Sequence, residues 1–193
     1  MAILMKKANL LSDQQVHLLN GMEGRVDVYF TPLVPGAFPS EVVFVNNASR
    51  ISASLDYEDL DFKFEYFFFQ IRPFYGELGK KVESTEVKVV RCILRCEWKH
   101  KEQGGKVTFG RGKVEDVPDN AMACCSDVGL LMVSADGSRV LIYSDDNFPL
   151  SVGVTKEDDF INGYLNSCDV IDVDHVSEFS KNLFDKGFNV DYV

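Results

Sequence analysis

The sequence predicts an α+β fold, with a mostly antiparallel sheet, a short N-terminal helix and two C-terminal helices. Three observations carry this prediction. A hairpin signal stands at residues 136–137, residues 86–99 alternate between apolar and polar side chains, and two capped amphipathic stretches follow residue 155. The order of helix, strands and then two helices lacks the regular alternation of strands and helices in doubly wound folds.

The hairpin is the strongest local signal in the chain and lies within residues 129–149. Asp136 and Gly137 separate two apolar runs and tolerate the positive φ angles of a two-residue type I′ turn. Such a turn would pair Val133 with Val140, Met132 with Leu141 and Leu131 with Ile142. Both strands are apolar on both faces, which favours the centre of a covered sheet. The hairpin is expected to end at Asp145, Asp146, Asn147 and Pro149.

The N-terminal third predicts one helix and three strands. Ser12 and Gln15 have capping-box spacing, so we expect a helix from about residue 13 to 20 that stops near Gly21. Residues 1–9 form either a loose start or a short strand. Strands are predicted at 26–30, 42–45 and 51–55, followed by an acidic turn at 57–60.

The middle of the chain predicts longer strands. Residues 62–69 begin with alternation and end as a continuous aromatic run, so we expect one strand that is buried on both faces at its end. A polar connection at 80–83 leads to the strand at 86–99. A short strand is expected at 106–109 and a loop from Gly110 onwards, with a helical turn at 119–125 as an alternative. One face of the 86–99 strand would carry Val90, Cys92, Leu94, Cys96 and Trp98.

The C-terminal part predicts a short strand at 151–154 and then the two helices. Thr155 and Asp158 have capping-box spacing, and Asp174 is positioned to cap the last helix, which Gly187 ends. Residues 188–193 form a last strand or a tail. The first of the two helices would present one apolar face, made of Phe160, Ile161, Tyr164, Leu165 and Cys168.

Length and composition favour one globular domain over residues 1–193, with an acidic helical part from about residue 150. No apolar run approaches the ~20 residues of a membrane helix, and the apolar start at residues 1–5 is too short for a signal peptide. We therefore expect a soluble cytoplasmic protein that does not contact membranes. The five cysteines show no disulfide framework and are expected to be reduced.

The charge is distributed unevenly along the chain. Residues 1–114 contain 16 Lys and Arg and 14 Asp and Glu, a net charge of +2, whereas residues 115–193 contain 4 and 16, a net charge of −12. The net charge of −10 therefore comes entirely from the second part. An acidic surface repels nucleic acids and attracts basic partners, and it speeds their encounter. The same charge is also compatible with solubility alone.

Several residue groups are candidates for chemistry. Cys92, Cys96 and His100 could hold zinc together with Cys168 or His175, although two core cysteines beside a polar strand end explain the same spacing. The group Asp169, Asp172, Asp174 and His175 could hold a hard cation or a general base, although helix capping in an acidic loop is the simpler interpretation. The sequence predicts neither a metal nor a cofactor.

Three further patterns have ordinary structural explanations. The glycines at 104–112 lack the ending of a phosphate-binding loop and read as hairpin turns. Cys124 and Cys125 could supply a nucleophile but lack a protease signature and fit a structural pair. Residues 72–114 combine basic side chains with aromatic ones, a composition that suits nucleic-acid binding; the aromatic residues are Phe74, Tyr75, Trp98 and Phe109. The acidic second part of the chain disfavours such binding, because it would repel phosphates.

These observations favour a protein-binding protein over an enzyme, in particular an acidic inhibitor or immunity-type protein that neutralises a basic toxin or nuclease domain. One alternative is a small enzyme with its site at 169–175. Another is a structural or oligomerisation module that uses the aromatic strand 62–71. The expected partner-binding residues are Asp145, Asp146, Glu157, Asp158, Asp159, Asp169, Asp172 and Asp174.

Overall fold

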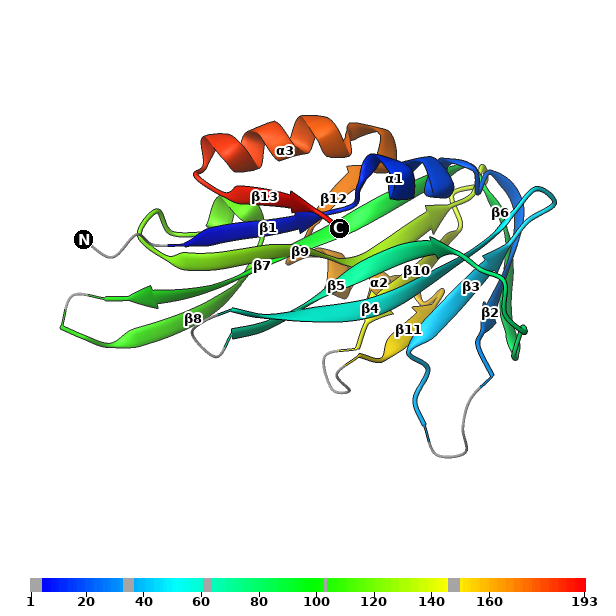
Figure 1. The fold of residues 1–193 in the computed structure, drawn as a ribbon, viewed down its shortest axis with the longest axis horizontal. Coiled ribbons are helices and arrows are strands. Elements are labelled where there is room, and N and C mark those ends of the chain that lie inside the picture. Colours follow the sequence, from blue (N-terminus) through cyan, green and yellow to red (C-terminus); the bar gives the residue numbers. More distant parts are fainter. Residues whose placement is uncertain (1–4, 33–36, 61–63, 103, 146–149) are drawn as a thin grey trace.

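The computed structural model describes the chain except residues 1–4, 33–36, 61–63, 103 and 146–149. The described residues form thirteen strands in two largely antiparallel sheets and three α-helices, which confirms the α+β prediction (Figure 1). The helices are α1 (Asp13–Asn20), α2 (Asp158–Leu165) and α3 (Val176–Asp185), with 3-10 helices at Val114–Asp116 and Val173–His175. None of the helices in this described part has the length and apolarity that crossing a membrane requires.

The strands divide between an eight-stranded sheet, sheet A, and a five-stranded sheet, sheet B. Sheet A contains β1 (Lys6–Leu10), β7 (Val89–Lys101), β8 (Val107–Gly112), β9 (Met122–Val133), β10 (Arg139–Ser144), β11 (Val152–Thr155), β12 (Asp169–Asp172) and β13 (Asn189–Tyr192). Sheet B has the order β5-β4-β3-β2-β6 and contains β2 (Gly24–Phe30), β3 (Glu41–Val45), β4 (Arg50–Leu60), β5 (Phe64–Pro73) and β6 (Lys81–Val87).

Sheet A is built on the long antiparallel pair β7 and β9. Their pairing runs from Val89 opposite Val133 to Lys99 opposite Met122. The free edge of β7 pairs first with β12 and then with β8, and the free edge of β9 pairs with β1 and then with β10. The β1–β9 and β1–β13 pairs are parallel. Figure 1 shows α3 running alongside β13 and β1.

One hydrophobic core joins the two sheets and two of the helices. Fully buried side chains such as Phe44 and Phe69 of sheet B share this core with Cys92 and Leu130 of sheet A. A second, smaller cluster lies where α2 packs on sheet A, around Ile161. The predicted apolar face of β7 is confirmed, because Val90, Cys92, Leu94, Cys96 and Trp98 all belong to the larger cluster.

Four predicted connections are strands or parts of strands instead. β4 continues through the expected turn at 57–60, where it pairs with β5 as far as Leu60 opposite Phe64. Residues 81–83 of the expected polar connection at 80–83 belong to β6, which pairs with β2. β8 extends to Gly112, and β9 begins at Met122 where a helical turn was the alternative. Backbone pairing with a partner strand outweighs the polar composition of these segments.

The central hairpin is confirmed, but its register is shifted by one residue from the expected one. Val133 lies opposite Arg139, and Met132 opposite Val140. The turn spans Ser134–Ser138, closed by a hydrogen bond from the Ser134 amide to the Ser138 carbonyl. Only Gly137 has a positive φ in this turn, at 86°, whereas a type I′ turn needs two such residues. Asp136 instead accepts a hydrogen bond from the Ser138 amide.

The expected helix caps are wrong in detail. Ser12 precedes α1, but its side chain caps no backbone group. Thr155 accepts a hydrogen bond from the Glu157 amide, and α2 begins at Asp158 without a side-chain cap. Asp174 lies in the 3-10 helix before α3 and accepts a hydrogen bond from Asn20 of α1. Gly187 follows α3 with φ of 81°, as expected of a residue that ends a helix.

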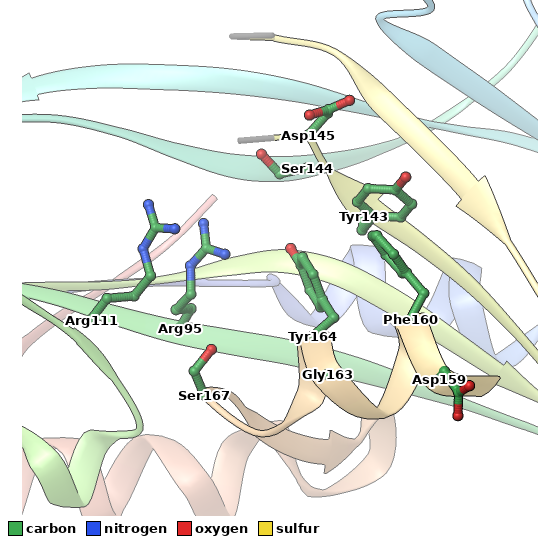
Figure 2. Close-up of a pocket in the computed structure, with 10 residues that line it drawn as sticks. All are labelled: Arg95, Arg111, Tyr143, Ser144, Asp145, Asp159, Phe160, Gly163, Tyr164 and Ser167. Atoms are coloured by element: carbon green, nitrogen blue, oxygen red, sulfur yellow. The ribbon is translucent and has the colours of Figure 1, made fainter. Parts of the chain in front are cut away.

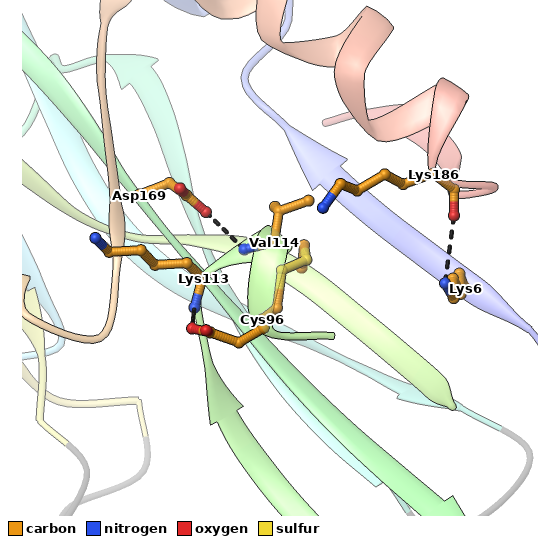
Figure 3. The surroundings of a disulfide bond; sticks show 8 residues. Lys6, Cys96, Lys113, Val114, Asp169 and Lys186 are labelled. Carbon is orange, nitrogen blue, oxygen red and sulfur yellow. Dashed lines mark hydrogen bonds between the residues drawn. A yellow bond between two sulfur atoms is a disulfide. The ribbon is translucent and has the colours of Figure 1, made fainter. Parts of the chain in front are cut away.

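The prediction that all cysteines are reduced is wrong for two of them. Cys96 and Cys125 lie directly opposite one another in the β7–β9 ladder, with Cα atoms 4.0 Å apart, and they form a disulfide (Figure 3). The two are 29 residues apart in sequence, so only the strand register reveals that they meet. The other three cysteines are buried. Disulfides are typical of oxidising compartments, so this bond does not favour the expected cytoplasmic location.

A carboxyl group is buried inside sheet A. Asp127 is 1% exposed and accepts a hydrogen bond of 3.0 Å from the Leu11 amide. Burial raises the pKa of Asp127 to about 7, against an ordinary value of 3.8, while the Leu11 hydrogen bond acts in the opposite direction. The folded protein therefore binds a proton here at pH values where the unfolded chain has lost it.

We predict that Asp127→Asn removes a pH-dependent loss of stability. Because folding raises the pKa of Asp127, proton binding by this carboxyl stabilises the folded wild-type protein. This stabilisation is complete below about pH 4 and is lost as the pH rises to about 7. The free energy of unfolding of the variant minus that of wild type should therefore increase by on the order of 2 kcal/mol from pH 5 to pH 8, measured by urea denaturation at both pH values. The exposed Asp119→Asn is the control, and an equal difference at both pH values would contradict this account.

The disulfide gives a second prediction. Alkylation of the unfolded protein should label three cysteines without reductant and five after reduction. Reduction should lower the free energy of unfolding by about 3 kcal/mol, since it frees a loop of this length in the unfolded chain. A Cys96→Ala/Cys125→Ala variant should be insensitive to reductant. Labelling of all five cysteines before reduction would disprove the bond.

Candidate functional site

A pocket of about 470 Å³ opens where α2 and β10 meet the β7–β8 pair (Figure 2). Its lining combines two arginines, three aromatic rings and two carboxylates from elements far apart in the sequence. The lining residues are Arg95, Arg111, Tyr143, Ser144, Asp145, Asp159, Phe160, Gly163, Tyr164 and Ser167. Most ligand sites in proteins are concavities of this size, with a few convergent polar groups on an apolar wall.

A bulge in sheet A fixes one wall of the pocket. Ile93 pairs with Gly129 and Leu94 with Asp127, so Val128 is an extra residue in β9. A bulged residue stands outside the regular ladder. The Val128 carbonyl accepts a hydrogen bond of 3.1 Å from the Tyr164 hydroxyl. This bond, together with the buried Ile161, holds α2 against the sheet with the Tyr164 ring facing the pocket.

The three aromatic rings form one group. The ring centroid of Tyr143 lies 4.8 Å from that of Phe160 and 5.5 Å from that of Tyr164. Tyr143 lies opposite Gly153 in the β10–β11 pair, and a Cβ at Gly153 would stand 2.3 Å from the ring. The absence of a side chain at residue 153 therefore permits this ring position. Burial raises the pKa of Tyr143, with a further contribution from the charges of Asp145 and Glu157.

The two arginines reach the pocket from adjacent strands. Arg95 of β7 is 7% exposed, and its guanidinium lies 5.7 Å from the centroid of the Tyr164 ring. Arg111 of β8 is more exposed and contacts the Glu97 carboxylate at 2.8 Å. The same Glu97 oxygen lies 3.8 Å from Arg95. One carboxylate thus lies within ion-pair distance of both guanidinium groups, which Figure 2 shows side by side.

The expected partner-binding acids divide into two groups. Glu157, Asp158 and Asp159 are exposed at the start of α2, and Asp145 lines the pocket together with Asp159. Asp158 also contacts Arg139 at 2.5 Å. Asp146 lies outside the described residues. We call Asp145, Glu157, Asp158 and Asp159 the acidic edge.

The remaining three acids bond to different elements of the fold. Asp169 accepts a hydrogen bond of 2.8 Å from the Val114 amide, and burial raises its pKa. Asp172 contacts Arg91 at 2.6 Å, and Asp174 accepts the hydrogen bond from Asn20. Asp169 and Asp172 also line a shallow cavity of about 550 Å³ with His175.

The structure removes two cysteines from the candidate metal ligands and nucleophiles. Cys96 and Cys125 are joined in the disulfide, which removes Cys96 as a thiolate ligand and Cys125 as a nucleophile. Cys124 is buried. Within the described part of the chain, no three His, Cys, Asp or Glu side chains gather as a metal site would require. Gly104 and Gly105 have positive φ values in the β7–β8 turn, in keeping with the hairpin-turn interpretation.

The two surface alternatives can also be placed. In the basic segment 72–114, Phe109 is 69% exposed on β8, and Lys99 lies 5.7 Å from the centroid of its ring. On the aromatic strand, Phe68 and Phe69 are buried within the chain itself. These two rings therefore give no surface to a subunit interface.

Sequence reasoning did not find the arginine–aromatic pocket. The sequence pattern places Arg95 on the face of the 86–99 strand opposite its apolar face, Arg111 in the loop from Gly110 onwards, and Tyr164 on the apolar face of a helix. The sequence contains one weak indication of the pocket. Arg95 lies in a strand whose other face is apolar, so its own face could line a site. The residues meet only through the β7–β8 register and the packing of α2.

Comparisons of the chain with protein-family models, curated proteins and solved structures give no match.

Two glycines beside the pocket give a matched prediction. Gly153→Ala should displace the Tyr143 ring and lower the free energy of unfolding by about 1 to 3 kcal/mol. Gly163→Ala, where a Cβ meets open space on α2, should raise it by about 0.5 to 1 kcal/mol. Thermal or urea unfolding measures both. A neutral Gly153→Ala with an unchanged Tyr143 environment, seen by NMR, would contradict the ring placement.

Proposed function

We propose that this chain is a protein-binding protein that docks a basic partner through the acidic edge, in the manner of an inhibitor or immunity protein. The observation that carries the proposal is the contrast between the two groups of acids. Asp169, Asp172 and Asp174 bond to neighbouring elements of the fold, whereas Glu157 and Asp159 stand exposed at the start of α2.

The surroundings of the acidic edge suit a basic side chain. Phe160 is 41% exposed directly beside Asp159, and Tyr143 and Tyr164 extend the aromatic surface into the pocket. Lysine and arginine bind well where an aromatic face adjoins carboxylates, because both attract the cation. Aromatic residues are also the usual anchors of protein interfaces.

The overall charge supports the same partner class. Residues 115–193, which contain the whole acidic edge, hold 16 acidic against 4 basic residues. A field of this sign accelerates the approach of a basic protein and is weakened by salt. The proposal therefore requires association that slows as the ionic strength rises.

A second candidate is the small enzyme with a site at 169–175. The cavity shared by Asp169, Asp172 and His175 favours it, as does the raised pKa of Asp169. Alanine at Asp172 and His175 would then abolish turnover with little change in melting temperature. The contact of Asp172 with Arg91 instead favours a structural role for this group.

The docking proposal predicts a charge-specific loss of binding. Immobilised wild-type protein should retain a basic protein from source lysate at about 50 mM salt and release it at about 500 mM. Glu157→Gln/Asp159→Asn should slow association with that partner roughly three- to tenfold, measured by surface plasmon resonance, without unfolding the protein.

The control carries the same change in charge elsewhere on the surface. Asp119→Asn/Asp185→Asn removes two exposed carboxylates outside the acidic edge. It should leave association within about twofold of wild type. Equal slowing by both double variants would show that net charge, rather than the acidic edge, governs binding. Retention that salt does not reverse would also contradict the proposal.

A further inference from the structure

We propose that the pocket binds a basic residue that carries a free α-carboxylate, with the carboxylate on Arg95 and Arg111 and the side-chain cation at the acidic edge. The source of such a residue is the C-terminal Lys or Arg of a polypeptide or the free amino acid. This inference deepens the docking proposal and rests on it for the basic character of the partner.

One end of the pocket is built for a carboxylate. Arg95 and Arg111 extend from neighbouring strands, Arg111 bonds to the Glu97 carboxylate, and Arg95 lies within ion-pair distance of it. Arg95 is held almost fully buried in the sheet, so little conformational entropy is lost when an anion binds to it. Planar guanidinium groups recognise carboxylates through paired hydrogen bonds.

The opposite end is negative. Asp145 and Asp159 both line the pocket, on separate sides of the aromatic rings in Figure 2, and the charges of Asp145 and Glu157 help to raise the pKa of Tyr143. Figure 2 shows Tyr164 next to the arginines and Phe160 beyond it towards Asp159, with Tyr143 between Phe160 and Asp145. The methylene stem of a lysine or arginine packs well on such rings while its charged head reaches the carboxylates.

The two charged ends together restrict the ligand class. A simple anion would satisfy the arginines but would be repelled by Asp145 and Asp159. A simple cation would satisfy these two carboxylates but would be repelled by the arginines. A ligand with opposite charges at its two ends suits both. The volume of about 470 Å³ accommodates one such residue and its backbone rather than a folded surface.

The test compares peptides that differ in one group. An acetylated tetrapeptide, Gly-Ala-Gly-Arg, with a free C-terminus is titrated into the wild-type protein by calorimetry at low salt, followed by its C-terminal amide and a version that ends in norleucine. We expect the amide and the norleucine peptide each to bind at least about tenfold more weakly, since each loses one charged contact. Equal affinity for the free acid and the amide would overturn the inference.

Matched variants locate the binding. Arg111→Gln removes a half-exposed guanidinium from the pocket, and Arg91→Gln removes a similarly exposed one that pairs with Asp172 outside it. Only Arg111→Gln should weaken the free-acid peptide, by about tenfold. Free L-arginine distinguishes the two ligand sources, because binding as tight as that of the peptide would assign the pocket to the amino acid.

The outcomes also separate this inference from the docking proposal. Absence of binding by every peptide and by arginine overturns the inference. If the lysate partner is still retained through Glu157 and Asp159, the docking proposal stands without an occupied pocket. If the free-acid peptide binds but no partner is retained, the pocket is a site for the small ligand and the docking proposal fails.

Discussion

The antiparallel ladder between β7 and β9 is the constraint on which the rest of the structure depends. It pairs the two strands from Val89 to Lys99, and each of its outer edges changes partner along its length. Because of this change of partners, β7 and β9 pair directly with four further strands of sheet A. The same ladder places Cys96 opposite Cys125 and sends the apolar face of β7 into the core shared with sheet B. Side chains of sheet B, α1 and α3 belong to this same core.

One irregularity in that ladder links folding to the pocket. The extra residue Val128 offers its carbonyl to Tyr164, and the preceding Asp127 places its carboxyl under the Leu11 amide. The first contact holds α2 on the sheet, and the second joins the end of β1 to β9. A carboxyl buried in this way lowers stability at neutral pH, so its position here opposes rather than assists folding. Bulges often lie next to binding sites, where they redirect side chains.

Local sequence signals predicted the secondary-structure elements better than the contacts between those elements. The hairpin signal at Gly137, the alternation along β7 and the helix at 13–20 each depend on neighbouring residues, and all three elements are present. The hairpin register slipped by one because Asp136 does not adopt a positive φ. The disulfide and the Arg95–Arg111 pair depend on which strands become neighbours. Neither composition nor local sequence pattern specifies that pairing. Of the predicted acids, the structure gathers four at the acidic edge and gives Asp169, Asp172 and Asp174 separate partners.

The central claim is that the β7–β9 ladder is the most stable unit and that the pocket is built upon it. Native-state hydrogen exchange, read amide by amide by NMR, tests this most directly. The account predicts that the slowest amides lie in β7 and β9, around Cys92–Leu94 and Leu130–Met132, and exchange only through global unfolding. It also predicts that strands of sheet B open at lower free energy. If β3 and β4 retained protons longer than β7 and β9, the ladder would not be the organising element and this account of the fold would be wrong.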